Sequence, residues 1–97
     1  MRTSIIMLLA VLGMADGLAQ TGTLIVLNKS DHTATLIDVA SRNVRGTVPT
    51  GTAPHEVAVS PDGKTAVVAN YGTRETPGNT LSVIDISAKR KLKDIDL

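Results

Sequence analysis

Residues 54–64 read PHEVAVSPDGK, a short apolar run that ends in a Pro-Asp-Gly turn, and this stretch decides the fold. Pro61 presets the backbone for the first central position of a tight turn, and Asp62 tolerates the next position. Gly63 accepts the left-handed conformation that closes a hairpin. We therefore assign these three residues a structural role and expect two antiparallel strands around them, Glu56–Ser60 and Thr65–Asn70.

Short β-branched runs separated by turn residues also fill the remainder of the chain from residue 20 onward. Runs at a spacing of about ten residues with turn signals between them are typical of an all-β protein. The further strands that this pattern predicts are Thr23–Asn28, Thr35–Val39, Val44–Val48, Thr80–Ile86 and Lys91–Leu97.

The pattern then occurs twice. The run Thr65–Asn70 lies 42 positions after Thr23–Asn28, and the two share Thr and Asn at their ends. Residues 81–86 lie 47 positions after residues 34–39, and both contain an Ile-Asp pair. A period in the low forties with four strands indicates a β-propeller blade. The alternative is a small β-sandwich whose halves are similar by chance.

Three stretches together resemble the YVTN-type β-propeller repeat family: residues 54–64, VVANYG at 67–72 and LSVID at 81–85. The chain departs from the family at Val67 and Ala69, which stand in place of the Tyr and Thr of its namesake tetrapeptide. The connector Tyr71–Asn79 is also lengthened. The resemblance implies an exported seven-bladed propeller with four antiparallel strands in each blade. Residues 51–97 would then form one full blade and residues 20–50 three strands of another.

This blade count is small for a propeller, which needs about four to eight blades. We expect the chain to be the N-terminal part of a longer propeller, or a truncated gene product. Its first partner would then be the missing C-terminal blades of the same protein. Assembly of several copies into a ring is the less favoured alternative.

Residues 1–19 have the pattern of a helical secretory signal peptide. Arg2 supplies the positive start, Ile5–Leu12 is apolar, and small residues at Gly17 and Ala19 precede a cleavage site before Gln20. The apolar run is shorter than the roughly 20 residues that span a bilayer. We therefore expect no integral membrane span after cleavage, and a periplasmic, cell-surface or extracellular product.

The composition excludes several classes of function. The chain has 10 Lys and Arg against 9 Asp and Glu, which is too balanced for the basic surface that binds nucleic acid. It has no cysteine, and therefore no disulfide, thiolate metal site or thiol nucleophile. A single tyrosine is its only aromatic residue of the Phe, Trp and Tyr group, which excludes a base-stacking surface.

Four residues are weak candidates for binding a protein or small molecule at the channel face: His55, Asn70, Tyr71 and Arg74. His55 lies where the chain enters the inner strand, and the other three lie in the lengthened connector, where loops often carry specificity. The structural alternative is that His55 only joins loops and that the connector is a tolerated insertion.

The remaining polar residues suit structural roles. We expect His32 to be solvated, and Asp38 and Asp85 to close Asx turns. No catalytic residue, metal site or cofactor motif is predicted. The favoured function is a binding or interaction scaffold, and the alternative is part of a propeller enzyme, either a lactonase-like protein or a quinoprotein-like oxidoreductase.

Overall fold

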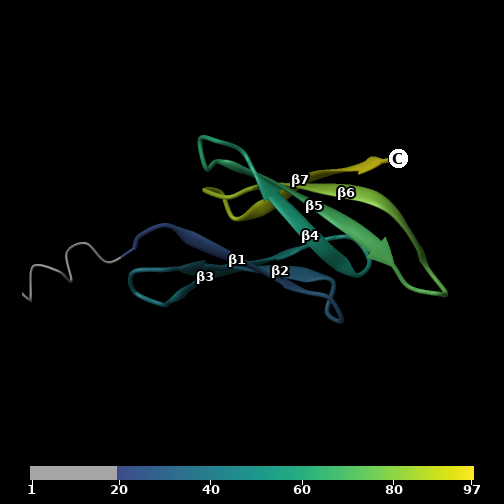
Figure 1. Cartoon of the computed structure of the whole chain (residues 1–97), viewed down its shortest axis with the longest axis horizontal. Coiled ribbons are helices and arrows are strands. Elements are labelled where there is room, and N and C mark those ends of the chain that lie inside the picture. Colours follow the sequence, from purple (N-terminus) through teal and green to yellow (C-terminus); the bar gives the residue numbers. More distant parts are fainter. Residues whose placement is uncertain (1–19) are drawn as a thin grey trace, which may run out of the picture.

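A computed structural model describes residues 20–97, so the expected signal peptide at residues 1–19 lies outside the described part. The described chain forms two antiparallel sheets (Figure 1). The first has the order β1-β2-β3 and the second the order β4-β5-β6-β7. The sheets thus have the form of propeller blades, one complete and one of three strands. The strands are β1 (Thr23–Asn28), β2 (Thr33–Asp38), β3 (Val44–Pro49), β4 (Pro54–Val59), β5 (Thr65–Gly72), β6 (Pro77–Asp85) and β7 (Arg90–Asp96).

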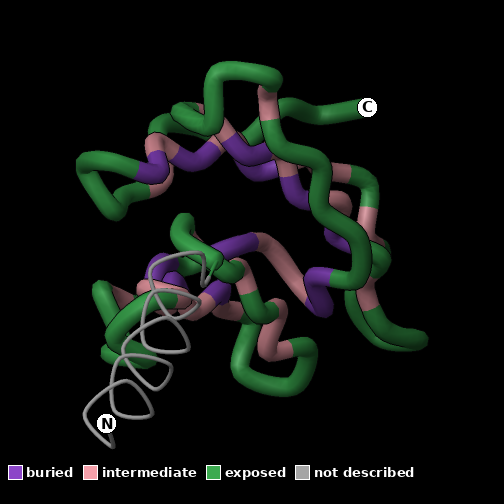
Figure 2. The backbone as a smooth tube through the Cα atoms, turned by 60° about the vertical axis from the view of Figure 1, so that its left-hand side comes forward, coloured by how far each residue is buried: buried purple, intermediate pink, exposed green. Residues whose placement is uncertain are grey.

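The core lies between the two sheets, where the buried residues gather (Figure 2). Because successive side chains of a strand point to opposite faces, only every second residue enters it. In β5, Ala66 and Val68 are buried, and in β2, Ala34 and Leu36 are buried. The core is aliphatic and consists of Ala34, Leu36, Val48, Ala66, Val68, Ile84 and Ile86, with Ile25 and Leu27 packed against it.

The lengthened connector is shorter in the structure than the sequence predicts. Strand β5 continues to Gly72 and β6 begins at Pro77, so only residues 73–76 form the turn. Two glycines allow this: Gly72 has a φ of +78°, and a Cβ on Gly78 would lie 2.0 Å from the carbonyl carbon of Tyr71. Side chains at these positions would keep the two strands apart.

The other strand boundaries agree with the sequence to within a few residues. Strand β1 has the predicted bounds, whereas β2 begins at Thr33 and ends at Asp38 instead of covering Thr35–Val39. The pairing of Asn28 with Thr33 adds the two residues at its start, because β2 follows β1 over its whole length.

In each sheet, an aspartate closes the turn between the last two strands. The Asp38 carboxylate accepts hydrogen bonds from the Ser41 hydroxyl at 2.7 Å and the Ser41 amide at 2.9 Å, and these bonds lower its pKa. The Asp85 carboxylate accepts a bond from the Ala88 amide at 2.9 Å. Both aspartates thus close turns, as the sequence predicts, but each accepts from the amide three residues on, whereas an Asx turn uses the amide two residues on.

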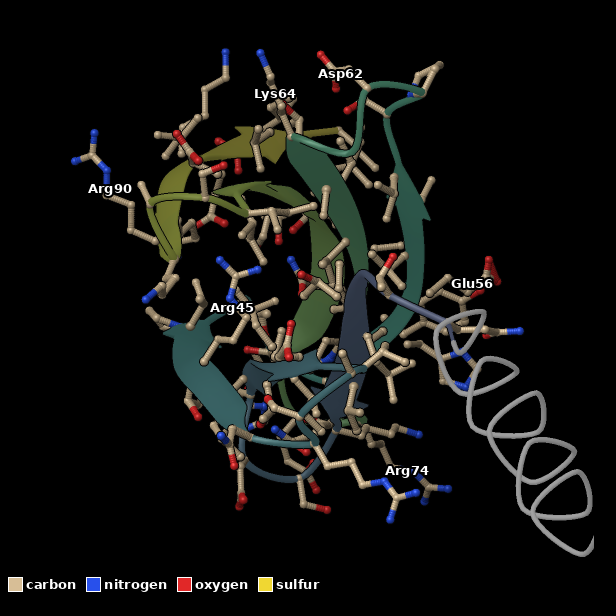
Figure 3. All side chains as sticks on the ribbon, turned by 90° about the vertical axis from the view of Figure 1, so that its left-hand side faces the viewer. Arg45, Glu56, Asp62, Lys64, Arg74 and Arg90 are labelled. Carbon is tan, nitrogen blue, oxygen red and sulfur yellow. The ribbon has the colours of Figure 1, made fainter. Side chains whose placement is uncertain are left out.

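The Pro-Asp-Gly turn is closed by its own side chains. Asp62 accepts hydrogen bonds from the Ser60 hydroxyl at 2.6 Å and the Lys64 amide at 3.0 Å, and both lower the pKa of its carboxyl group. Gly63 has a φ of +73°, a value that L side chains rarely adopt. Asp62 and Lys64 lie together at the outer end of the hairpin (Figure 3).

Candidate functional site

Residues 50–53 carry the chain from the first sheet to the second, and His32 holds this crossing segment. The His32 carbonyl accepts a hydrogen bond from the Thr50 amide at 2.9 Å. The ring atom Nδ1 of His32 accepts another hydrogen bond from the Ala53 amide at 3.0 Å. His32 is exposed, as expected, but its ring has a structural role that the sequence does not predict, since it holds the segment that joins the two sheets.

Asn70 fixes the same segment from the other side. It belongs to β5 and not to a connector, and only 3% of it is exposed. Its Oδ1 accepts a hydrogen bond from the Gly51 amide at 3.1 Å, and its Nδ2 donates to the hydroxyls of Thr80 and Ser82, each at 3.0 Å. The amide group is thus used inside the protein, and Asn70 is not presented to a ligand.

His55 and Tyr71 form a stacked pair on the surface. Their ring centroids are 4.3 Å apart and the rings are inclined by 13°. The pair forms because the register of β4 against β5 shifts between Pro54 and Glu56, which places His55 outside the regular ladder. Both residues are exposed, and 51% of Tyr71 is accessible to solvent.

Glu56 completes this surface, which we call the platform (His55, Glu56 and Tyr71). The Tyr71 hydroxyl donates a short hydrogen bond to Oε1 of Glu56. That bond is the main reason that the pKa of Tyr71 is raised. Glu56 projects from the β4 edge away from the space between the sheets (Figure 3). Glu56 is not among the site residues that the sequence predicts, because the bulge that places it diagonally to Tyr71 has no clear sequence signal.

Arg74 is not part of the platform. It lies in the turn at residues 73–76 and points away from the molecule, well apart from Glu56 (Figure 3). Of the four predicted binding residues, the structure therefore brings two together, His55 and Tyr71. It directs Asn70 inward and leaves Arg74 on a separate tip.

The platform is an open surface, since no cavity occurs among residues 20–97. Within the same range, no three His, Asp or Glu side chains approach closely enough to hold a metal ion. The ring of Tyr71 can attract a cation above the face that His55 leaves free, and the carboxylate of Glu56 can pair with a guanidinium or ammonium group. No helix of the described residues is long and apolar enough to cross a membrane.

Comparison with known proteins bears on the fold. No family model matches the chain, and no curated protein sequence matches it. Among solved structures, the chain is similar to the hydrazine synthase of Kuenenia stuttgartiensis, with a TM-score of 0.69 and 33% sequence identity. The match covers 78% of this chain but only 20% of that one. It supports the blade architecture, while the resemblance to the YVTN-type family stays a prediction.

Proposed function

We propose that the chain is part of an exported β-propeller that acts as a binding scaffold, with the platform as its contact surface. The observation that carries this proposal is the exposed stack of His55 on Tyr71, joined to Glu56 by a hydrogen bond. Strand β4, which carries two of the three residues, is an edge strand of its sheet. The family resemblance makes it the inner strand of a blade, so the platform would lie beside the channel.

Matching hydrogen bonds in the two sheets support the repeat on which this proposal depends. Asn28 donates to the hydroxyls of Thr33 and Thr35. Asn70, 42 positions later, donates to those of Thr80 and Ser82, which lie 47 positions after the two threonines. Two turn residues 47 positions apart, Arg42 and Lys89, have the same left-handed backbone, with φ of 66° and 58°. Equivalent residues thus have equivalent structural roles.

The chemistry of the platform favours a ligand with a planar cationic group. A guanidinium group can stack on an aromatic face and donate paired hydrogen bonds to a carboxylate, and both partners lie side by side here. The free edge of β4 can also receive an extended peptide by strand addition. We therefore expect the ligand to be a peptide segment that contains arginine.

The test is a titration of residues 20–97 with a short arginine-containing peptide, followed by the fluorescence of Tyr71. The signal is specific because the protein has one tyrosine and no tryptophan. We expect saturable binding that is at least about tenfold weaker in Glu56→Gln, equivalent to about 1.4 kcal/mol. Tyr71→Ala lacks the fluorophore, so its binding of the peptide would be followed by NMR chemical-shift changes.

Arg74→Ala is the matched control, because Arg74 is exposed and lies apart from the platform. It should bind the peptide as the unmodified protein does. Equal binding by Glu56→Gln, or equal binding of a peptide with glutamate in place of arginine, would contradict the proposal.

A second candidate function is part of a propeller enzyme. The similarity to part of hydrazine synthase favours it, because that protein is named as an enzyme. The lactonase-like and quinoprotein-like alternatives belong to this class. An enzyme would need side chains from several blades to converge with His55 on the channel. Lactone hydrolysis or electron transfer by a full-length protein, abolished in His55→Ala, would favour this candidate over the scaffold.

Export has its own test. Expression of the whole chain in a bacterium should give a periplasmic or secreted product whose mass corresponds to a start at Gln20. Replacement of a small residue at the expected cleavage site, Ala19→Lys, should leave the longer precursor. Retention of the unmodified chain in the cytoplasm at full length would contradict export.

A further inference from the structure

Each sheet has an apolar face that turns away from the core. On the four-stranded sheet we call it the front face, and on the three-stranded sheet the back face. Burial alternates along the strands, so these residues are the ones between the core positions. The front face consists of Val67, Ala69, Leu81, Val83 and Ile95, and the back face of Leu24, Val26, Thr35 and Ile37.

The front face corresponds to a surface that is already packed inside the molecule. Shifted by 42 positions, Ile25 and Leu27 of β1 fall on Val67 and Ala69. Shifted by 47 positions, the three buried residues of β2 and β3, which are Ala34, Leu36 and Val48, fall on Leu81, Val83 and Ile95. The front face is therefore equivalent to the side that the first sheet presents to the core.

The back face corresponds to the other half of the same interface. Leu24 and Val26 fall on Ala66 and Val68, which are buried against the first sheet. Thr35 and Ile37 likewise fall on the buried residues Ser82 and Ile84. The core is thus formed by a front-type surface packed on a back-type surface, and the molecule exposes one further surface of each type.

We propose that the front face of one copy of this chain packs on the back face of a second copy. The contact continues the order of sheets inside the molecule and covers exposed apolar side chains. Leu24 is 52% exposed, Val26 37% and Ile95 38%. Because the two faces differ, the contact is heterologous, and it can join copies into rings or open chains.

The rim of this contact carries like charges. Inside the molecule, the Lys89 side chain lies over Gly46, 3.5 Å from the position of a Cβ there. The equivalent residues at the new contact are Arg42 of one copy and Lys93 of the other. Both are exposed, so salt screens their repulsion. Association should therefore become stronger, not weaker, as salt is added.

Charged substitutions on single faces test the proposal on purified residues 20–97. Val83→Asp blocks the front face and Val26→Asp blocks the back face. In analytical ultracentrifugation, the unmodified chain should associate with rising concentration, while each variant alone should be monomeric. An equimolar mixture of the two variants should form a heterodimer and nothing larger, because one intact front face then meets one intact back face.

Arg74→Asp, on the exposed turn at residues 73–76, is the matched control and should associate as the unmodified chain does. Ile95→Asp is a second front variant at a more exposed position, and circular dichroism shows whether each variant is folded. A monomeric unmodified chain at all concentrations would overturn the proposal, and would leave the faces to further blades of a longer polypeptide. Self-association of Val26→Asp alone would overturn it too, by indicating a front-to-front contact.

The outcome is separate from that of the proposed scaffold function. The four substitutions lie outside the platform, so the arginine-peptide titration can be run on each of them. A monomeric unmodified chain that still binds the peptide would overturn only the contact between copies.

Discussion

Substitution of Asn70 by alanine should be among the most destabilising single changes in the described chain. The side chain is 3% exposed and links the crossing segment to β6. Alanine removes the bond from Gly51 at 3.1 Å, two bonds to hydroxyls at 3.0 Å and a weaker one to the Thr80 carbonyl at 3.4 Å. Each buried hydrogen bond contributes about 0.5–1.5 kcal/mol net, so the expected loss for the four bonds is about 2–6 kcal/mol.

Asn28→Ala is the internal control for this prediction. Asn28 occupies the equivalent position, but it is only partly buried and donates just two bonds, to Thr33 at 3.1 Å and Thr35 at 2.8 Å. Water can replace these bonds, so the cost should be about 0.5–1 kcal/mol. Asn28 does not bond to the crossing segment. The difference between the two variants therefore measures what the bond from Gly51 adds to the bonds within the sheet.

The measurement is urea unfolding of both variants, followed by circular dichroism at one protein concentration. A fixed concentration matters because association between copies would itself add stability. For a domain of this size, each kcal/mol also shifts the melting temperature by about 4–8 °C. A loss for Asn70→Ala no greater than that for Asn28→Ala would refute the assignment of Asn70 as the clamp on the crossing segment.

Three further predictions concern exposed groups. Glu56→Gln should lower the pKa of Tyr71 towards its ordinary value of 10.0, because the bond to Glu56 raises it, and the phenolate absorbance of this single tyrosine measures the change. Since that pKa is raised on folding, its contribution to stability is present below pH 10.0 and lost as the pH rises through the folded value. Asp62→Asn should weaken the acid dependence of the urea midpoint, because the lowered pKa of Asp62 contributes stability above pH 3.8 that is lost as the pH falls through the folded value. Arg42→Gly should stabilise the fold by up to about 1 kcal/mol and so raise the melting temperature, because glycine relieves the strain of a left-handed backbone at φ 66°. An unchanged or lower melting temperature would contradict that strain.

The features that the sequence predicts well are local ones. The Pro-Asp-Gly turn and the turns closed by Asp38 and Asp85 depend on bonds between residues at most three positions apart, as in Asp62 to Lys64 and Asp38 to Ser41. The short β-branched runs and the turn residues between them predict the strands for the same reason, and β1 has the predicted bounds. The fold class follows from these local signals and their period.

The features that the sequence does not predict depend on distant partners. His32 bonds to Ala53, 21 positions away, so its own neighbours give no sign of this role. The connector between β5 and β6 is short because Gly72 and Gly78 approach each other closely across the two strands. Asn70 looks available in a loop but is satisfied by residues 10 to 19 positions away. The candidate site is half predictable: His55 and Tyr71 are conspicuous residues, whereas Glu56 requires the bulge in β4.

The contact between copies and the platform are compatible because of an asymmetry between the sheets. The first sheet has three strands and the second four, so β4 is only partly covered, where β1 approaches it. Val57 and Val59 on the core side of β4 show the result, since they remain 37% and 49% exposed. If a second copy packs its three-stranded sheet on the front face, that sheet again lacks a fourth strand, so β4 stays at least partly open. The platform would then stay accessible in the assembled form, and peptide binding should survive association.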